Sequence, residues 1–186
     1  MRLLNLLPLL LLPPPCLPLA PYPALLSAVP SPSGSKLPAD IQAALAAKVD
    51  ALVSTASAPP STADELTGTH RLVYSTAPGP SSGSLGPFVG SVTQTFVDEV
   101  RFVNRVELGP LKLELSARRT AIDGKRYRVS FDDLSVSCFS LPLLAKTVGG
   151  EGVWELRFVE ACEGSGGRKV RVMSTPSIFV LEEVES

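Results

Sequence analysis

The sequence predicts a mainly β protein, in which an antiparallel sheet of about eight short strands closes into a barrel preceded by one helix. From Gly68 onward, apolar and polar residues alternate, as in strands with one buried and one solvated face. Turn-forming residues separate the alternating segments at short intervals. Before Gly68, only one stretch has apolar residues that recur at helical spacing. A sheet of this size must close on itself or protect its edges, which favours a barrel.

Residues 1–37 differ in composition from the rest of the chain and are assigned to a targeting segment. Arg2 is the only charged residue up to Ser35. A leucine-rich run from Leu3 to Leu12 follows it, and Pro13 ends that run. This order is typical of a secretory signal peptide, and the run is too short to span a bilayer.

Two cleavage positions and two destinations fit this segment. Ala20 and Ala28 are small residues after which cleavage would fit. The stretch from Pro21 to Lys36 is rich in Pro, Ser and Ala and has no acid, as in a transit peptide or a disordered linker. A signal peptide followed by a transit-like stretch favours import into a plastid with extra membranes. Simple secretion is the alternative.

Residues 38–186 are expected to form a single domain. The 186-residue chain has a formal net charge of −1, so its composition gives no reason to expect nucleic acid as a partner. Its cysteines are Cys16, Cys138 and Cys162, and their spacing fits no zinc site. Cys138 and Cys162 are interpreted as two packed thiols, with a disulfide between them as the alternative.

One amphipathic helix is predicted from Asp40 to Val53, with Asp40 as its N-cap. Its apolar residues recur on one face, at Ile41, Leu45, Val49 and Leu52. We expect this helix to lie across a barrel mouth or a sheet face. The functional alternative is that it closes a ligand cavity or touches a membrane surface.

Period-two alternation and turn signals set the predicted strands. Asp123-Gly124 is expected to form a type I′ hairpin turn, and the Gly-, Pro- and Ser-rich loop from Ala77 to Phe88 is a candidate lid at the barrel mouth. The strands are expected at residues 71–76, 90–97, 100–108, 111–118 and 126–131, around Trp154, Leu156 and Phe158, and at 168–173 and 177–181.

Several short motifs follow one another along the chain in an order that is characteristic of a known family. They are Leu66–Thr76 (LTGTHRLVYST), Gly90–Gln94 (GSVTQ), Asn104–Glu107 (NRVE), Val170–Ser174 (VRVMS) and Phe179–Leu181 (FVL). With these motifs, the chain resembles the plastid lipid-associated proteins, also called fibrillins, over roughly residues 40–184.

The chain also departs from the family pattern. His70 stands where the family usually has Trp, and Ser174 stands where a second Arg is common. The segment Phe158–Glu163 replaces an acidic stretch, and Gly164–Gly167 lengthens the loop after it.

The resemblance implies a lipocalin-like β-barrel and a non-catalytic function. Family members bind or organise carotenoids, quinones and other lipids in the chloroplast, at plastoglobules or thylakoids. The partners implied are a hydrophobic small molecule or lipid and, peripherally, a membrane or lipid-globule surface. A structural coat protein of lipid globules with a filled barrel is the alternative. An enzyme of lipid or quinone metabolism is a weaker one.

The sequence offers little for catalysis, and we expect no enzyme activity and no cofactor or metal. His70 is the only histidine, so any Ser-His-Asp or Cys-His arrangement would need it. It is interpreted as an ordinary sheet residue. The acid pairs Asp98-Glu99 and Asp132-Asp133 are interpreted as solvated charge at turns or strand ends.

Polar residues of the motifs are candidates for a ligand site. In one interpretation Gln94 and Arg171 face the barrel interior and orient the polar head of an apolar ligand, with Glu107 as the acid beside Arg171. In the other, Gln94, Asn104 and Glu107 satisfy backbone groups and pair with Arg171 at one barrel end. Whether the interior is hollow stays open. The candidate ligand-binding residues are Tyr74, Gln94, Phe102, Glu107, Trp154, Phe158 and Arg171.

Overall fold

The computed structural model describes residues 20–29, 37–62 and 67–184. Segments in which apolar and polar residues alternate form strands, and successive strands pair as antiparallel hairpins. The strands are β1 (Gly68–Ser75), β2 (Ser84–Leu85), β3 (Phe88–Val89), β4 (Ser91–Phe96), β5 (Arg101–Leu108), β6 (Leu111–Ala121), β7 (Arg126–Cys138), β8 (Leu141–Thr147), β9 (Glu151–Ala161), β10 (Lys169–Thr175) and β11 (Ser177–Glu183).

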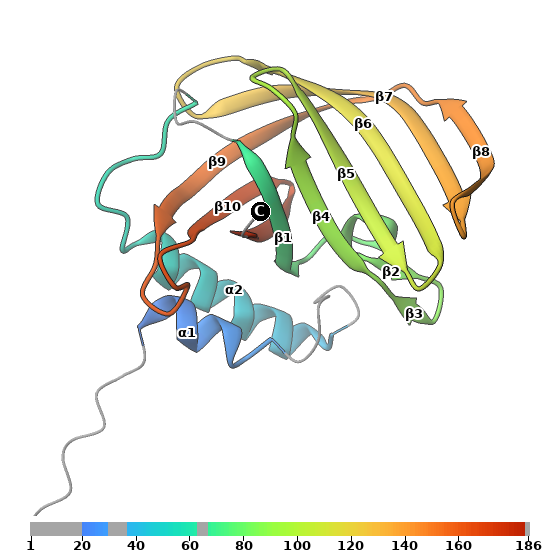
Figure 1. The fold of residues 1–186 in the computed structure, drawn as a ribbon. Helices are drawn as coiled ribbons and strands as arrows, with labels where there is room; N and C mark the ends of the chain where they lie inside the picture. Colours follow the sequence, from blue (N-terminus) through green and yellow to red (C-terminus); the bar gives the residue numbers. More distant parts are fainter. Residues whose placement is uncertain (1–19, 30–36, 63–66, 185–186) are drawn as a thin grey trace, which may run out of the picture.

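Nine of these strands form one antiparallel sheet in the order β6-β5-β4-β1-β11-β10-β9-β7-β8. Strand β6 also pairs with β7, so every strand of this sheet except β8 belongs to a closed ring (Figure 1). Strands β2 and β3 form a separate small hairpin. The predicted antiparallel barrel of about eight strands is therefore confirmed.

The ring is not equally closed at its two ends. The first part of β7, Arg126–Ser130, pairs with β9, whereas its later part pairs with β8. Strand β8 was not predicted, because Leu141-Pro142-Leu143-Leu144 does not alternate and proline is rare inside strands. Beyond the end of β9 the long β6, β7 and β8 strands extend as a flared sheet (Figure 1). We call this the open end of the barrel.

At the opposite end, an aspartate carboxylate accepts backbone hydrogen bonds in each of two hairpin turns. Asp123 accepts hydrogen bonds from the backbone N–H of Lys125 and Arg126, both at 2.9 Å, and Asp98 accepts them from Val100 at 2.9 Å and Arg101 at 2.6 Å. The predicted type I′ turn at Asp123-Gly124 is wrong, because neither residue has a positive φ. The aspartate carboxylate organises a longer turn instead.

The two acid pairs have different positions. Asp98-Glu99 lies at a turn, as expected. Asp132-Asp133 does not, because both residues lie inside β7. There Asp132 accepts a hydrogen bond from Nη2 of Arg118 at 2.7 Å, across the β6–β7 pair.

Helix α2 (Ala39–Val53) covers one outer face of the barrel, over β1, β9, β10 and β11 (Figure 1). The prediction that it lies on a sheet face is confirmed. Its buried residues are Leu45, Val49 and Leu52, while Ile41 stays 40% exposed. Asp40 is not the N-cap, because the helix begins one residue earlier, after Pro38. No helix among the described residues is long and apolar enough to span a membrane.

A second helix, α1 (Pro21–Leu26), lies within the segment that the sequence assigned to targeting. Tyr22 and Leu25 are fully buried in the same core cluster as α2, and the loop after β9 fits closely against α1. A Cβ on Gly164 would come within 2.6 Å of Cγ of Pro23. The signal-peptide residues 1–19, the linker residues 30–36 and Leu66 of the first motif lie outside the described residues.

An ion-pair centre joins strands β1 and β11 beneath the helices. Glu182 is 2% exposed and accepts hydrogen bonds from Arg71 at 2.5 Å and Arg168 at 2.8 Å. Burial raises the pKa of Glu182, but the hydrogen bonds from Arg71 and Arg168 outweigh burial and hold this pKa below its ordinary value. The ionised carboxylate is thus the form that the fold stabilises.

This shift predicts an acid-dependent loss of stability. Because the pKa of Glu182 is lower in the folded than in the unfolded chain, its contribution is present above the unfolded pKa of about 4.3 and is lost as the pH falls through the folded value. Glu182→Gln should lower the stability at neutral pH and flatten the acid limb. Urea unfolding midpoints between neutral and acidic pH test this. Glu183→Gln is the control, and equal acid limbs for wild type and Glu182→Gln would contradict the prediction.

Candidate ligand-binding cavity

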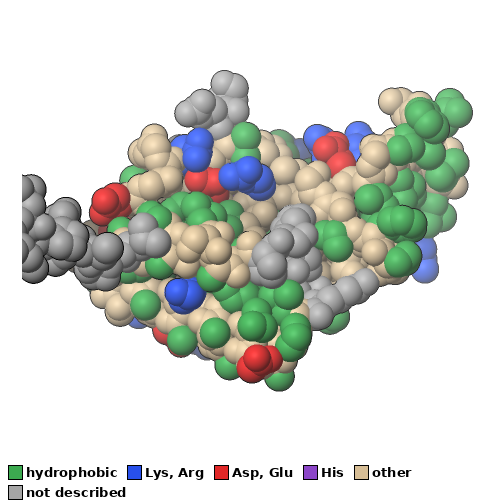
Figure 2. All heavy atoms as spheres, turned by 90° about the horizontal axis from the view of Figure 1, so that it is seen from below, with side chains coloured by type: hydrophobic (Ala, Val, Ile, Leu, Met, Phe, Trp, Pro, Cys, Tyr) green, Lys and Arg blue, Asp and Glu red, His purple; other side chains and the backbone are tan. Residues whose placement is uncertain are grey.

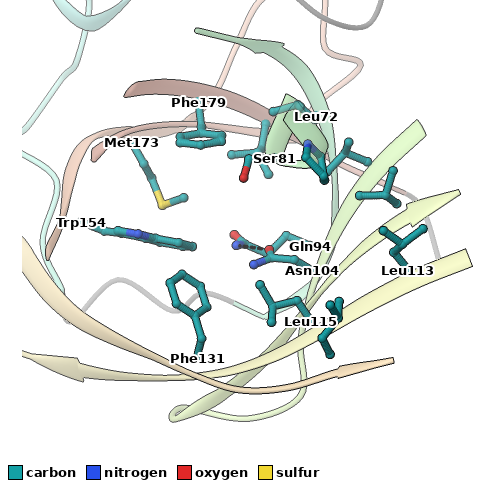
Figure 3. A pocket seen from close by; sticks show the side chains of 15 residues that line it. Leu72, Ser81, Gln94, Asn104, Leu113, Leu115, Phe131, Trp154, Met173 and Phe179 are labelled. Atoms are coloured by element: carbon teal, nitrogen blue, oxygen red, sulfur yellow. Dashed lines mark hydrogen bonds between the residues drawn. The ribbon is translucent and has the colours of Figure 1, made fainter. Parts of the chain in front are cut away.

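The barrel interior is hollow in its open half. A cavity of about 160 Å³ lies there, and Figure 3 shows its side chains pointing inward from the strands on all sides. Most of the lining is aliphatic or aromatic. The lining residues are Leu72, Pro80, Ser81, Val92, Gln94, Asn104, Val106, Leu113, Leu115, Phe131, Leu134, Trp154, Met173, Phe179 and Leu181.

Period-two alternation explains which side chains reach the cavity. On β5, Asn104 and Val106 point inward and Arg105 points to the outer face. A layer of rings fills the barrel beneath the cavity. Phe102 lies between Phe96, at 5.8 Å between ring centroids, and Trp154, at 5.3 Å. Trp154 belongs to both the ring layer and the lining, so it forms the floor of the cavity.

Two amides form the polar part of the lining. Gln94 on β4 faces Asn104 on β5, and its Nε2 donates a hydrogen bond to Oδ1 of Asn104 at 2.8 Å (Figure 3). Nη2 of Arg171, which can only donate, binds Oε1 of Gln94. The guanidinium therefore fixes the orientation of both amides.

This chain of donors ends in the cavity. With its Oδ1 engaged by Gln94, Asn104 has its NH₂ group left to donate. Within the described part of the chain, that group has no hydrogen-bond acceptor. The cavity thus presents an N–H donor, polarised by the cation behind Gln94, to any ligand that enters.

Arg171 is fully buried and lacks a carboxylate partner among the described residues. The guanidinium carbons of Arg171 and Arg119 each lie 4.5 Å from the centroid of the Phe96 ring. Burial and the positive charge of Arg119 lower the pKa of Arg171 to about 9. Nε and Nη1 of Arg171 have no hydrogen-bond partner in the described structure. A buried cation without an acid is costly to the fold.

His70 lies inside the barrel beside Gln94 in the β1–β4 register. It is 3% exposed, and its ring meets the edge of Phe96 at 5.7 Å. Burial and the charge of Arg171 lower the pKa of His70 to about 3, so the imidazole is neutral at physiological pH. Its Nδ1 has no partner among the described residues, and this part of the chain groups no three His, Cys, Asp or Glu side chains that could hold a metal ion.

The predicted site residues fall into three groups. Gln94 and Trp154 line the cavity, while Phe102 and Arg171 lie directly behind these two. Tyr74 and Phe158 do not reach the interior. They pack on the outer face of the barrel beneath the helices, in the cluster that contains Tyr22 and Leu25.

Glu107 is on the outer face as well, where its carboxylate lies 3.9 Å from Arg105. The expectation that Glu107 pairs with Arg171 is therefore wrong. Strand parity gives the reason, since Phe102 and Asn104 face inward and Glu107 is an odd number of residues from both. For Tyr74, a register shift between Leu72 and Tyr74 displaces the alternation of β1.

The same strand parity would have predicted other lining residues from the sequence. Leu113, Leu115 and Leu134 alternate on β6 and β7 and form the wall toward the open end. Met173 carried no such signal, because a register shift in the β9–β10 pair precedes it.

The loop proposed as a lid does lie at the cavity. It contains a short 3₁₀ helix, η1 (Gly79–Ser82), from which Pro80 and Ser81 contribute to the lining. The loop is held to the barrel by the backbone N–H of Gly90, which donates a hydrogen bond to the carbonyl oxygen of Gly83 at 2.8 Å. Gly90 itself lies so close to β5 that an added Cβ would come within 2.4 Å of the carbonyl oxygen of Glu107. Only glycine permits this approach.

The two described cysteines are free thiols. Cys138 ends β7 opposite Leu111 at the open end, and Cys162 packs beneath the helices. Burial raises the pKa of Cys162 to about 11, so it is a protonated, packed thiol.

Comparisons with protein-family models, with curated proteins and with solved structures find no match to this chain. The cavity and the sequence motifs are therefore the basis for the function of this protein.

Proposed function

We propose that this protein binds a mostly apolar small molecule inside the barrel and holds it by an acceptor oxygen. The observation that carries the proposal is the Arg171–Gln94–Asn104 chain, which ends as an N–H donor in an otherwise apolar cavity. Apolar contact supplies affinity at about 25 cal/mol per Å² buried, and the single polar contact sets orientation.

The size of the cavity narrows the ligand class. Its volume of about 160 Å³ is close to that of an engineered cavity of roughly 150 Å³ that holds one benzene molecule. It encloses a ring or a short chain, and a longer tail extends through the open end. A quinone or acyl carbonyl suits the Asn104 donor, whereas a pure hydrocarbon carotene would leave that donor unpaired.

The motif residues support the resemblance to the plastid lipid-associated proteins. Gln94, Asn104 and Arg171 come from three separate motifs, and the fold brings them into one hydrogen-bonded chain. We therefore keep plastid quinones and related lipids as the proposed ligands, and a plastoglobule or thylakoid as the proposed location. The hollow interior favours this function over a coat protein with a filled barrel. The neutral, buried His70 gives the enzyme alternative no support.

Asn104→Leu is expected to weaken binding of a short-chain prenylquinone about five- to tenfold, the value of one lost hydrogen bond. Trp154 is the only tryptophan and forms the cavity floor, so quenching of its fluorescence reports occupancy directly. Glu107→Gln, on the outer face of the same strand, is the matched control and should bind as wild type.

A second variant separates cavity binding from surface binding. Leu115→Phe adds volume to the lining and should abolish quenching while the barrel stays folded. Full quenching of Leu115→Phe, or equal affinities for Asn104→Leu and wild type, would refute an internal site.

A further inference from the structure

Two hairpins at the open end expose apolar side chains. The β7–β8 hairpin carries Phe139, which is 78% exposed, Leu141 at 67% and Leu143 at 62%, and the β2–β3 hairpin carries Phe88 at 61%. Figure 2 shows hydrophobic side chains gathered at the end of the molecule where β8 lies, at the right in both views. We call Phe88, Val89, Phe139, Leu141, Leu143 and Leu144 the apolar rim.

Both hairpins lie in parts of the chain that are almost free of charge. Between Arg71 and Asp98 the sequence has no Asp, Glu, Lys or Arg, and between Asp133 and Glu151 it has only Lys146. Most exposed surfaces of soluble domains mix charges of both signs. A contiguous apolar surface without charge marks an interaction site.

The hairpins at the opposite end show what an ordinary solvated turn of this protein contains. The β4–β5 turn has the ion pair Asp98–Arg101 at 2.7 Å, and the β6–β7 turn has Asp123–Arg126 at 2.6 Å. The exposed aliphatic residues there, Val97, Val100 and Ile122, are next to these ion pairs in the sequence. The hairpins at one end of the barrel thus carry exposed ion pairs, whereas those at the open end are apolar and almost free of charge.

The exposure of β8 on both faces identifies the kind of partner. All seven of its residues are exposed, and among the described strands it pairs only with β7. A protein strand added to its free edge would leave both faces of the ribbon in water, and Pro142 removes one N–H donor from the strand. A fluid apolar medium, by contrast, can cover both faces of the hairpin at once.

The backbone of the β7–β8 turn also presents Phe139 outward. Phe139 and Ser140 have φ values of 49° and 66°, a left-handed conformation that favours Asn or Gly. A phenylalanine at this position costs conformational energy without packing into the fold. Its side chain is available for a partner outside the protein.

We propose that the apolar rim docks onto the surface of a lipid layer, with its side chains at the boundary between head groups and acyl chains. The unpaired backbone of the β8 edge limits the depth, because N–H and C=O groups without partners are not tolerated in hydrocarbon. With no acid and a single lysine in the two charge-poor segments, docking depends on apolar burial and not on lipid charge.

Docking would place the cavity against the lipid. The cavity wall is made by Leu113 and Leu134, in the parts of β6 and β7 that extend toward β8, and by Pro80 and Ser81 of the loop that leads to β2. An apolar ligand could then pass between the lipid and the barrel without crossing water. The docking itself does not depend on whether the cavity binds a ligand.

The test is partition of the full chain onto vesicles of phosphatidylcholine alone. Phe139→Ser/Leu141→Ser/Leu143→Ser should lower the partition coefficient at least tenfold. The matched control is Val97→Ser/Val100→Ser/Ile122→Ser at the opposite end, where the exposed fractions are 55%, 48% and 42% and partition should not change. Because all six side chains are exposed, both variants should unfold at the temperature of wild type.

Three outcomes would overturn the proposal. They are equal loss of partition by both triple variants, binding that requires anionic lipid and disappears at high salt, and a dimer in lipid-free solution that only the rim variant dissociates. The last outcome would assign the rim to a second copy of the chain.

A second measurement reports the contact itself. Phe139→Trp in a Trp154→Phe background places the only tryptophan at the tip of the hairpin. Its emission should shift to the blue with vesicles and be quenched by lipids brominated near the head group. Val100→Trp in the same background should show neither effect, and a silent Phe139→Trp would also overturn the proposal. None of these readouts uses a cavity ligand, so failure here leaves the proposed function untouched.

Discussion

Gln94→Leu is expected to destabilise the barrel by about 3 kcal/mol, because it removes the hydrogen bond that the fully buried Arg171 makes to Gln94. Most of this cost comes from the charge that is left behind and not from the lost amide. Gln94→Leu/Arg171→Met, which removes the charge as well, should recover the stability to within about 1 kcal/mol of wild type. Urea unfolding of the wild type, of Gln94→Leu, of Arg171→Met and of the double variant measures the coupling energy between Gln94 and Arg171.

Arg105→Met is the control for loss of an arginine as such. Arg105 is half-exposed on the outer face and pairs with Glu114 at 2.8 Å, and a surface ion pair of this kind contributes about 1 kcal/mol or less. If the double variant lost as much stability as the two single variants added together, Arg171 would not be a costly group. The proposed function of Arg171, to polarise the amides of Gln94 and Asn104, would then gain no support from its cost to stability.

A chain that begins at Val29 is expected to be less stable than one that begins at Pro21 by about 2–4 kcal/mol. The shorter chain lacks Tyr22 and Leu25, which are 1% and 0% exposed in the core cluster beneath α2. Burying two large side chains contributes about 3–6 kcal/mol, part of which is offset by the entropy of ordering the segment. Thermal and urea unfolding of the two chains gives the difference.

Point variants in the full chain give the same test without truncation. Leu25→Ser should lower the unfolding midpoint clearly, while Leu26→Ser, its neighbour with 36% exposure, should have little effect. Equal stability of the two truncated chains would mean that α1 is not part of the domain. The expected result instead shows that residues 21–28 belong to the folded domain, upstream of the predicted boundary at residue 38.

The barrel was predictable because most of its strands have one buried and one solvated face. Alternation of this kind sets β4, β5 and β6 within a few residues. Strand β8 was not predicted because both of its faces are exposed and its first five residues are all apolar, so apolar and polar residues do not alternate there. Helix α1 escaped because its composition matches that of a targeting segment, and burial depends on tertiary contacts that composition does not encode.

The site was predictable in part. The motifs pointed to Gln94 and Arg171, and the fold brings them together. Glu107 was chosen because a buried Arg is expected to have an acid partner. That rule does not hold here, and the parity of β5 would have excluded Glu107 without any structure. The hollow interior was not predictable, since it depends on how side chains from many strands fill the ring.

The unneutralised guanidinium of Arg171 also defines the electrostatic potential of the barrel interior. In a region of low dielectric constant a fixed positive charge is screened weakly, so its field reaches the cavity. Burial is the main reason that the pKa of His70 is lowered, and the charge of Arg171 lowers it further. The same charge would act on a ligand in the cavity. Of two molecules with equal apolar surface, one with a carbonyl or carboxylate gains from this field and one with an amine is repelled. At the proposed ligand site, the barrel would therefore favour one ligand over another by the sign of its polar end, before any direct contact with Asn104.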